Sequence, residues 1–142
     1  RLGDTFRWKG EYVSTKGVEP VLDSIEGAGE AVVYGVEITG SNGRAGMACI
    51  RLDRAPAEFD FRGLLTELRR ELPHYAVPLF LRLSEKMETT GTFKHKKAPL
   101  KDQGFDPARC TDPLYAWLPG TESYVAVSTE LHRAIQGGEY RY

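Results

Sequence analysis

Two neighbouring apolar runs constrain this 142-residue chain most, because both read as buried β-strands joined by a tight turn. The runs are EAVVYGVEI at 30–38 and AGMACIRLD at 45–53, and the intervening GSNGR contains Asn42-Gly43. Asn-Gly adopts the positive φ angles that a two-residue hairpin turn requires. Short apolar runs bounded by turn residues favour strands. The two runs are therefore predicted to form the centre of a sheet.

An amphipathic helix and a third strand are predicted after these runs. Asp60 fits the N-cap of the helix, and its apolar positions share one face, namely Phe61, Leu64, Leu65, Leu68 and Leu72. Beyond Pro73 and Pro78, LFLRL at 79–83 reads as a strand. In sequence order, this predicted helix lies between the second and third predicted strands, and it is expected to cover the sheet.

The first 27 residues are predicted to form a hairpin and a short helix. TFRW and EYVS flank Lys9 and Gly10, which places an exposed hairpin tip at 9–11. Helical spacing follows, with Ser14 or Thr15 as N-cap and Gly27 as the stop; its apolar positions are Val18, Val21, Leu22 and Ile25. Because a proline beyond the first turn removes a hydrogen bond, the regular helix is predicted to start only at Pro20.

The C-terminal part of the sequence is less regular. METTGTFKHKK at 87–97 is predicted to be an exposed polar loop, and 106–120 is predicted to be irregular. TESYVAV at 121–127 reads as a short strand, and STELHRAI at 128–135 reads as a helix stopped by Gly137 and Gly138. The fold class is predicted to be α+β: an N-terminal β-hairpin and a central sheet of about three strands covered by two or three helices.

Composition excludes several classes of protein. Hydrophobic residues make up 41% and charged residues 27%, and the net charge is -1, which is typical of one globular domain and argues against a nucleic-acid binder. No apolar run reaches the length of a membrane span and no signal peptide is visible, so a cytoplasmic location is expected. Cys49 and Cys110 are expected to be reduced thiols. The cysteines and histidines show no metal-ligand spacing, so no metal site is predicted.

Three separated stretches resemble motifs of adenylate-forming acyl-CoA synthetases, in the form found in the fatty acid transport protein and very-long-chain acyl-CoA synthetase branch. They are RLGDTFRWKGEYVSTKGVE at 1–19, LPHYAVPLFLRL at 72–83 and TTGTFKHKK at 89–97. GRAGMA and GFDP also fit, so the resemblance covers nearly the whole chain. It implies that residues 1–142 are the mobile C-terminal domain of such an enzyme. Residue 1 lies within the first motif, so the chain is expected to be cut from a longer protein whose N-terminal adenylation domain is absent here.

The resemblance also implies a two-step ligase reaction. A fatty acid carboxylate attacks the α-phosphate of ATP to give an acyl-adenylate and pyrophosphate, and the thiol of coenzyme A then displaces AMP. Rotation of the C-terminal domain between the steps presents a different face to the active site each time. Mg²⁺ is expected on the ATP phosphates, held mainly by the N-terminal domain. The chain alone is expected to be inactive, and the expected location is cytoplasmic, with peripheral membrane association of the parent left open.

Lys94 matches the catalytic lysine of the late motif, four residues after Thr90. A flexible ammonium can neutralise the charge that develops on the carboxylate and α-phosphate during adenylation. The alternative is a solvated basic edge formed with His95, Lys96 and Lys97. For Lys96 and Lys97 the choice between surface charge and attraction of coenzyme A phosphates stays open.

Arg1, Gly3 and Asp4 match positions at the start of the family signature. Arg1 corresponds to an arginine beside the nucleotide, where a guanidinium can hold phosphate or ribose hydroxyls; the alternative is a frayed terminal charge. Gly3 corresponds to the hinge, where glycine can absorb large changes in φ and ψ. Asp4 is assigned to the hinge or, equally, to an ordinary turn.

The resemblance implies that the hairpin tip lines the tunnel for the pantetheine arm of coenzyme A after rotation. Its residues are Trp8, Lys9, Gly10 and Glu11. The alternative is a turn glycine beside a tryptophan that packs on the domain. Tyr12 departs from relatives with arginine or asparagine, so no nucleotide contact is assigned to it. Gly17 stands where many relatives have glutamate, and Glu19 is expected to be structural.

Three aromatic residues, Tyr34, Tyr75 and Trp117, are expected to pack in the core or on the surface rather than to stack on a cofactor.

Two rival functions stay open. One rival is a ligase for another carboxylate, of the carnitine or bile-acid type. The other is a non-enzymatic module that binds coenzyme A or a protein partner through the basic loop.

Overall fold

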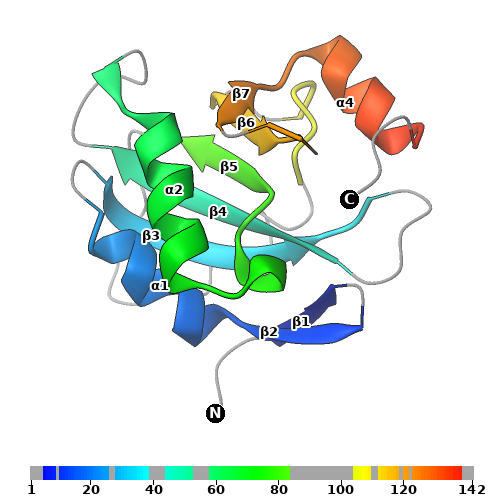
Figure 1. Cartoon of the computed structure of the whole chain (residues 1–142). Coiled ribbons are helices and arrows are strands. Elements are labelled where there is room, and N and C mark those ends of the chain that lie inside the picture. The colour runs from blue at the N-terminus through cyan, green and yellow to red at the C-terminus, as the bar shows by residue number, and fades with distance from the viewer. Residues whose placement is uncertain are drawn as a thin grey trace.

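The computed structural model of the chain (Figure 1) describes most of the predicted elements. The described residues are 5–8, 10–25, 28–38, 44–52, 58–83, 104–109, 112–118, 120–121 and 123–138. They form a two-stranded hairpin, a five-stranded sheet and the helices that pack on it. The α+β class is confirmed.

The main sheet has the strand order β3-β4-β5-β6-β7. The predicted hairpin is present, because β3 (Ala28–Val36) and β4 (Ala45–Leu52) pair antiparallel. β5 (Phe80–Leu83) pairs parallel with β4, and the chain between them contains a helix, as parallel pairing requires a long connection. All three strands predicted for the centre of the sheet are confirmed.

One strand was missed by the sequence interpretation. Residues 114–117 lie in the stretch predicted to be irregular, but they form β6 (Leu114–Trp117), antiparallel to β5. β6 in turn pairs with the expected short strand β7 (Tyr124–Ala126), so the sheet has five strands instead of about three. β6 is apolar at every position and flanked by prolines, so it lacks the alternation by which a strand is recognised.

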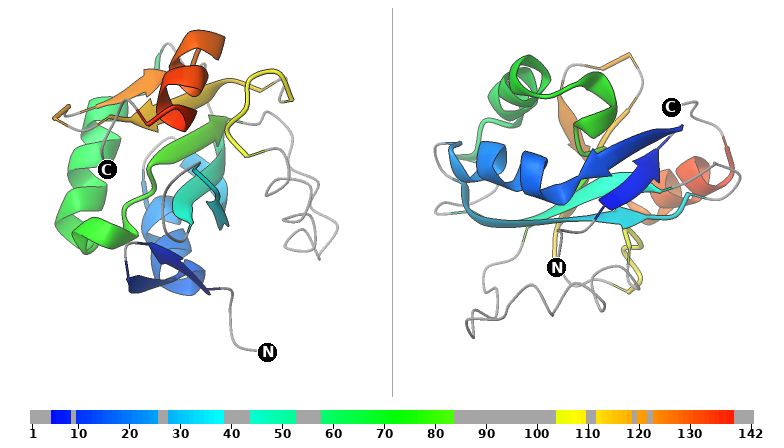
Figure 2. Two further views of the ribbon diagram at one scale, coloured as in Figure 1. Left: turned by 90° about the vertical axis from the view of Figure 1, so that its right-hand side faces the viewer. Right: turned by 90° about the horizontal axis from the view of Figure 1, so that it is seen from below.

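The helices follow the predicted capping signals. In α2 (Phe61–Glu71), the Asp60 carboxylate accepts a hydrogen bond from the Gly63 N–H at 2.9 Å, which confirms the predicted N-cap. In α4 (Thr129–Gln136), the Ser128 hydroxyl oxygen accepts one from the Leu131 N–H at 3.1 Å. Figure 2 shows α1 and α2 on one side of the sheet and α4 apart from them.

The first helix is longer than predicted. α1 spans Thr15–Asp23 and contains Pro20 in its interior, so the prediction that regular helix begins at Pro20 is wrong. Val18 and Leu22 are buried against the core, and Glu19 Oε2 accepts the Val33 N–H of β3 at 2.9 Å. These contacts hold the turns before Pro20 in place despite the missing hydrogen bond. Ser14 occupies the N-cap position without a side-chain hydrogen bond.

Part of the core lies between the sheet and the helices α1 and α2. β4 is buried along Ala45–Ile50, and α2 contributes Leu64, Leu65 and Leu68. Full burial of one leucine contributes about 1.5–3 kcal/mol, so this face of α2 fixes the helix on the sheet. Cys49 is buried and its sulfur is in the reduced thiol form, as expected.

A buried tyrosine joins the edge strand β7 to the entrance of β5. The Tyr124 hydroxyl donates a hydrogen bond to the Pro78 carbonyl at 2.7 Å, and Tyr124 is 4% exposed. Burial raises the pKa of the Tyr124 phenol well above its ordinary value. The folded state therefore retains the proton at alkaline pH values where the unfolded chain releases it.

We expect Tyr124→Phe to change the alkaline stability of the chain. At neutral pH the variant should be less stable by about 1 kcal/mol, because it loses one buried hydrogen bond. The stabilising effect of Tyr124 is complete below its unfolded pKa of about 10 and falls by about 1.4 kcal/mol per pH unit above it. The two stability curves should thus cross near pH 11, as measured by denaturant unfolding from pH 8 to 11. Parallel curves would contradict this role.

Candidate functional site

The N-terminal hairpin is the part of the predicted site that the structure describes best. β1 (Thr5–Trp8) and β2 (Glu11–Ser14) pair antiparallel, with Trp8 opposite Glu11. Gly10 in the turn has φ +87°, is exposed, and has no atom within 4 Å of the position of an added Cβ. The predicted exposed tip is confirmed for Gly10 and Glu11. Its turn needs a residue that tolerates positive φ, which glycine does without strain.

The Trp8 side chain is buried, although the sequence interpretation included Trp8 in the exposed tip. Its side chain is only 5% exposed and belongs to the hydrophobic core, on the same face of the hairpin as Val13. The alternative of a packing tryptophan therefore describes the Trp8 side chain, whereas Gly10 and Glu11 are exposed. The indole anchors the hairpin and leaves these two residues at its exposed tip.

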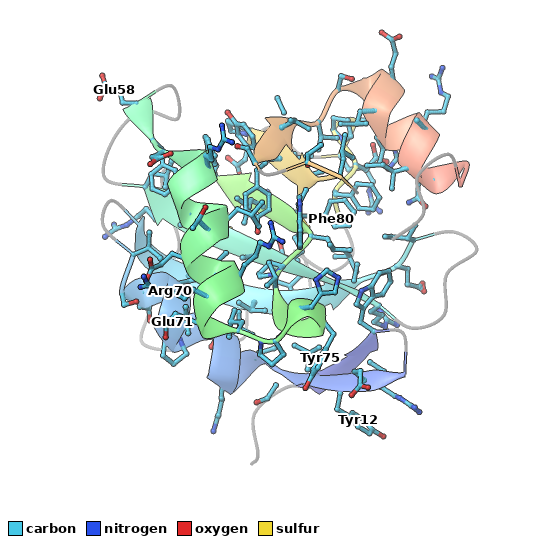
Figure 3. All side chains as sticks on the ribbon, in the orientation of Figure 1. Tyr12, Glu58, Arg70, Glu71, Tyr75 and Phe80 are labelled. Atoms are coloured by element: carbon cyan, nitrogen blue, oxygen red, sulfur yellow. The ribbon has the colours of Figure 1, made fainter. Side chains whose placement is uncertain are left out.

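The outer face of the hairpin carries an aromatic ring and a cation. Arg7 and Tyr12 are cross-strand partners, and the Arg7 guanidinium lies over the Tyr12 ring at 5.0 Å from its centroid. Tyr12 is 68% exposed and points away from the domain (Figure 3). Sequence reasoning assigned no contact to Tyr12. Arg7 and Tyr12 therefore form a cation–π pair on the outer face of the hairpin.

Backbone contacts fix the hairpin to the main sheet. The Arg44 N–H, just before β4, donates to the Arg7 carbonyl at 2.6 Å. Glu19 in α1 ties the following helix to β3 through the Val33 N–H, which confirms its predicted structural role. The hairpin tip is therefore carried on the sheet and not on a free arm.

Several predicted site residues lie outside the described residues. They are Arg1, Gly3, Asp4, Lys9 and Lys94, together with Lys96 and Lys97. Their roles stay predictions. Along the sequence, the described residues nearest to Lys94 are Leu83, at the end of β5, and Gly104.

The aromatic residues assigned to packing are largely buried. Tyr34 is 0% and Trp117 8% exposed, and the Trp117 Nε1–H donates to the Thr121 carbonyl at 2.8 Å. Arg69 lies over the Trp117 ring at 5.5 Å. Tyr75, in the short 3₁₀ helix η2 (His74–Ala76), is 36% exposed. The packing prediction is confirmed for Tyr34 and Trp117.

An open hollow of about 300 Å³ lies where the end of α1 meets the start of α2. Two of its three acidic lining residues have structural roles, since Asp60 caps α2 and Glu67 pairs with Arg70; the third is Glu58. Within the described ranges, no group of three or more histidine, cysteine, aspartate or glutamate residues is arranged to hold a metal ion. In the same part of the chain, no helix has the length and apolarity needed to cross a bilayer.

Comparison with curated proteins finds close relatives over the whole chain. Long-chain fatty acid transport protein 6 of Mus musculus is 45% identical over 141 residues, which cover 99% of this chain and 23% of that protein. The medium/long-chain-fatty-acid–CoA ligase FadD6 of Mycobacterium tuberculosis is 46% identical over 138 residues, 97% of this chain and 23% of that protein. The chain therefore spans less than a quarter of the length of these relatives. No protein-family model matches it.

Solved structures share the fold at lower identity. A fatty acyl CoA synthetase of Mycobacterium tuberculosis matches with TM-score 0.61 and 23% identity, over 70% of this chain and 19% of that one. The anthranilate CoA ligase AuaEII, solved with anthranoyl-AMP, matches with TM-score 0.61 and 20% identity, over 69% and 20%. At these identities the likeness shows a shared fold alone.

Proposed function

We propose, from homology to long-chain fatty acid transport proteins and fatty acyl-CoA ligases, that this chain is the C-terminal domain of an ATP-dependent fatty acid–CoA ligase. The observation that carries the proposal is identity of about 45% over essentially the full chain. The substrates of the whole protein would be a fatty acid, ATP and coenzyme A. The partner of this domain would be an N-terminal domain that holds most of the nucleotide, its Mg²⁺ and the acyl chain.

In this proposal Lys94 serves the first half-reaction. Its ammonium would approach the fatty acid carboxylate and the α-phosphate of ATP, where negative charge increases as the new P–O bond forms. Arg1 would hold the nucleotide, with Gly3 and Asp4 at the pivot between the two orientations. A lysine suits this task because it acts as a mobile point charge at the end of a flexible stem.

The hairpin would serve the second half-reaction. Gly10 and Glu11 are exposed at its tip, and the space around Gly10 is open, so the backbone there can approach a slender ligand closely. Trp8 would contribute through the core, by holding the turn in place. Arg7, which lies over the Tyr12 ring on the outer face of the hairpin, would add a positive charge that suits the phosphates of coenzyme A. Lys9, next to Gly10 in the sequence, would add a second.

The division of labour between two domains is tested by comparing this chain with the full-length protein. We expect the purified chain to fold but to catalyse no ATP–pyrophosphate exchange with a fatty acid, because it supplies a lysine and a closing face to a site built elsewhere. The full-length protein should catalyse the exchange. Appreciable exchange by the chain alone would overturn the proposal, and circular dichroism with a cooperative thermal transition verifies that the inactive chain is folded.

A further inference from the structure

The outer face of the N-terminal hairpin presents an aromatic ring to solvent. Tyr12 of β2 is 68% exposed and points away from the domain (Figure 3), whereas Tyr34 in the core is 0% exposed. The guanidinium of Arg7, the cross-strand partner of Tyr12, lies 5.0 Å from the centroid of the Tyr12 ring. Arg7 is exposed as well. Most of the Tyr12 ring is therefore available to a ligand, with a positive charge beside it.

Two arginines lie beside each other at this edge of the hairpin. The Arg44 N–H donates to the Arg7 carbonyl oxygen at 2.6 Å, and both residues are exposed. Glu11, the exposed acid at the tip, belongs to the opposite face, because it pairs with Trp8 and side chains alternate along a strand. Arginine can hold a phosphate with its fork of N–H donors while its plane stacks on an aromatic ring. The outer face is thus suited to a ligand that carries both phosphate and an aromatic base.

The Arg7–Tyr12 pair adjoins the tip that is proposed to line the tunnel. It is the next pair along the ladder after Trp8 and Glu11, which flank the turn. Successive residues of a strand are about 3.3 Å apart, so the pair lies one short step from the tip. Coenzyme A carries its thiol at one end of a slender arm and an adenine nucleotide at the other. If the tip lines the arm, the nucleotide end lies outside the tunnel, where the outer face of the hairpin is exposed.

We propose that Arg7 and Tyr12 bind the nucleotide end of coenzyme A, with the Tyr12 ring stacked on the adenine and the Arg7 guanidinium paired with a phosphate. This inference rests on the function proposed above. Stacking of a base on an exposed aromatic ring and pairing of arginine with phosphate are both favourable. The buried Trp8 indole holds the platform from the inner face of the hairpin. We assign the pair to coenzyme A rather than to ATP, because it adjoins the tip assigned to the coenzyme A step.

The test uses the full-length protein with Tyr12→Ala, which removes the ring, and Arg7→Gln, which removes the charge. Thioester formation from supplied acyl-AMP is measured with coenzyme A and with pantetheine, which has the arm and the thiol but no nucleotide. We expect each substitution to lower kcat/KM for coenzyme A on the order of tenfold and to leave kcat/KM for pantetheine near the parental value. Tyr12→Phe keeps a ring that can stack, so it should recover most of the loss.

A second measurement probes the nucleotide end without the arm. Phosphoadenosine diphosphate should compete with coenzyme A in the same assay, and Tyr12→Ala and Arg7→Gln should each raise its inhibition constant on the order of tenfold. Arg133→Gln removes an exposed arginine from α4, which lies away from the hairpin (Figure 1). This control variant should leave the reactions with both thiols and the inhibition constant unchanged.

The outcomes separate the nucleotide site from other roles of the pair. Equal loss with coenzyme A and pantetheine would mean that the pair only stabilises the hairpin, and a raised KM for ATP in adenylation would assign it to ATP. Either result, or an unchanged inhibition constant for phosphoadenosine diphosphate, rejects the inference. If Gly10→Leu leaves the coenzyme A step at the parental rate, the proposed role of the hairpin itself fails. If Gly10→Leu slows that step but neither Tyr12→Ala nor Arg7→Gln does, only the nucleotide site fails.

Discussion

Replacing Lys94 by alanine in the full-length protein is expected to slow acyl-adenylate formation by about a hundredfold or more, the effect of losing one transition-state charge contact of about 3 kcal/mol. Thioester formation from supplied acyl-AMP and coenzyme A should continue near the parental rate. The reason is that one face of the domain serves each half-reaction, so Lys94 would be near the reacting atoms in only one orientation. Single-turnover measurements of the two half-reactions give the partition directly.

A second lysine variant separates a specific contact from general loss of positive charge. Lys101→Ala removes the same charge from the same stretch of sequence but lies outside the late lysine motif. It should leave adenylation unchanged, since long-range charge effects are largely screened at physiological salt. Equal damage to both half-reactions in Lys94→Ala would indicate a structural lysine, and equal damage to adenylation in both variants would indicate a diffuse electrostatic effect.

Elements defined by local chemistry could be predicted from the sequence. Asp60 is both a capping residue and the neighbour of a 3.6-residue apolar pattern, so the start of α2 was predictable to the residue. The apolar runs around Asn42-Gly43 likewise predicted the β3–β4 pair. In both cases two independent local signals agree.

Elements defined by tertiary contacts were predicted less well. β6 consists of four apolar residues whose strand character comes from pairing with β5 and β7, and nothing local distinguishes it from a buried loop. α1 continues through Pro20 because burial of Val18 and Leu22 and the Glu19–Val33 hydrogen bond outweigh the local cost of the proline. A rule about one residue cannot include these distant contacts.

In the candidate site, too, features set by local sequence were predictable and features set by tertiary contacts were not. The turn at Gly10 was predictable from the two flanking β-prone runs. The burial of Trp8 agrees with alternation along β1, which puts Trp8 on the face opposite to the exposed Arg7, but the sequence interpretation treated the whole tip as one motif. The pairing of Arg7 with Tyr12 on the outer face needed the register of the hairpin, which the sequence alone leaves open.

Gly10→Leu in the full-length protein is expected to have the opposite effect to Lys94→Ala. It should slow the coenzyme A step roughly tenfold or more, because a side chain at the exposed tip would obstruct the path of the pantetheine arm, while adenylation stays largely intact. The obstacle to interpretation is strain. Leucine at φ +87° costs about 1–2 kcal/mol whatever space surrounds it. A loss of activity could therefore reflect a weakened hairpin instead of a blocked ligand.

Gly120 provides a matched control for that strain. It has φ +81°, is exposed, and also has no atom within 4 Å of an added Cβ, but it lies between β6 and β7, away from the hairpin. Gly120→Leu should lower the thermal stability of the chain about as much as Gly10→Leu and leave both half-reactions unchanged. Because the two substitutions introduce the same side chain at nearly the same φ, the difference between them in the coenzyme A step measures obstruction alone. If Gly10→Leu folds normally and converts acyl-AMP and coenzyme A at the parental rate, the tip does not line the tunnel and the hairpin is a structural turn.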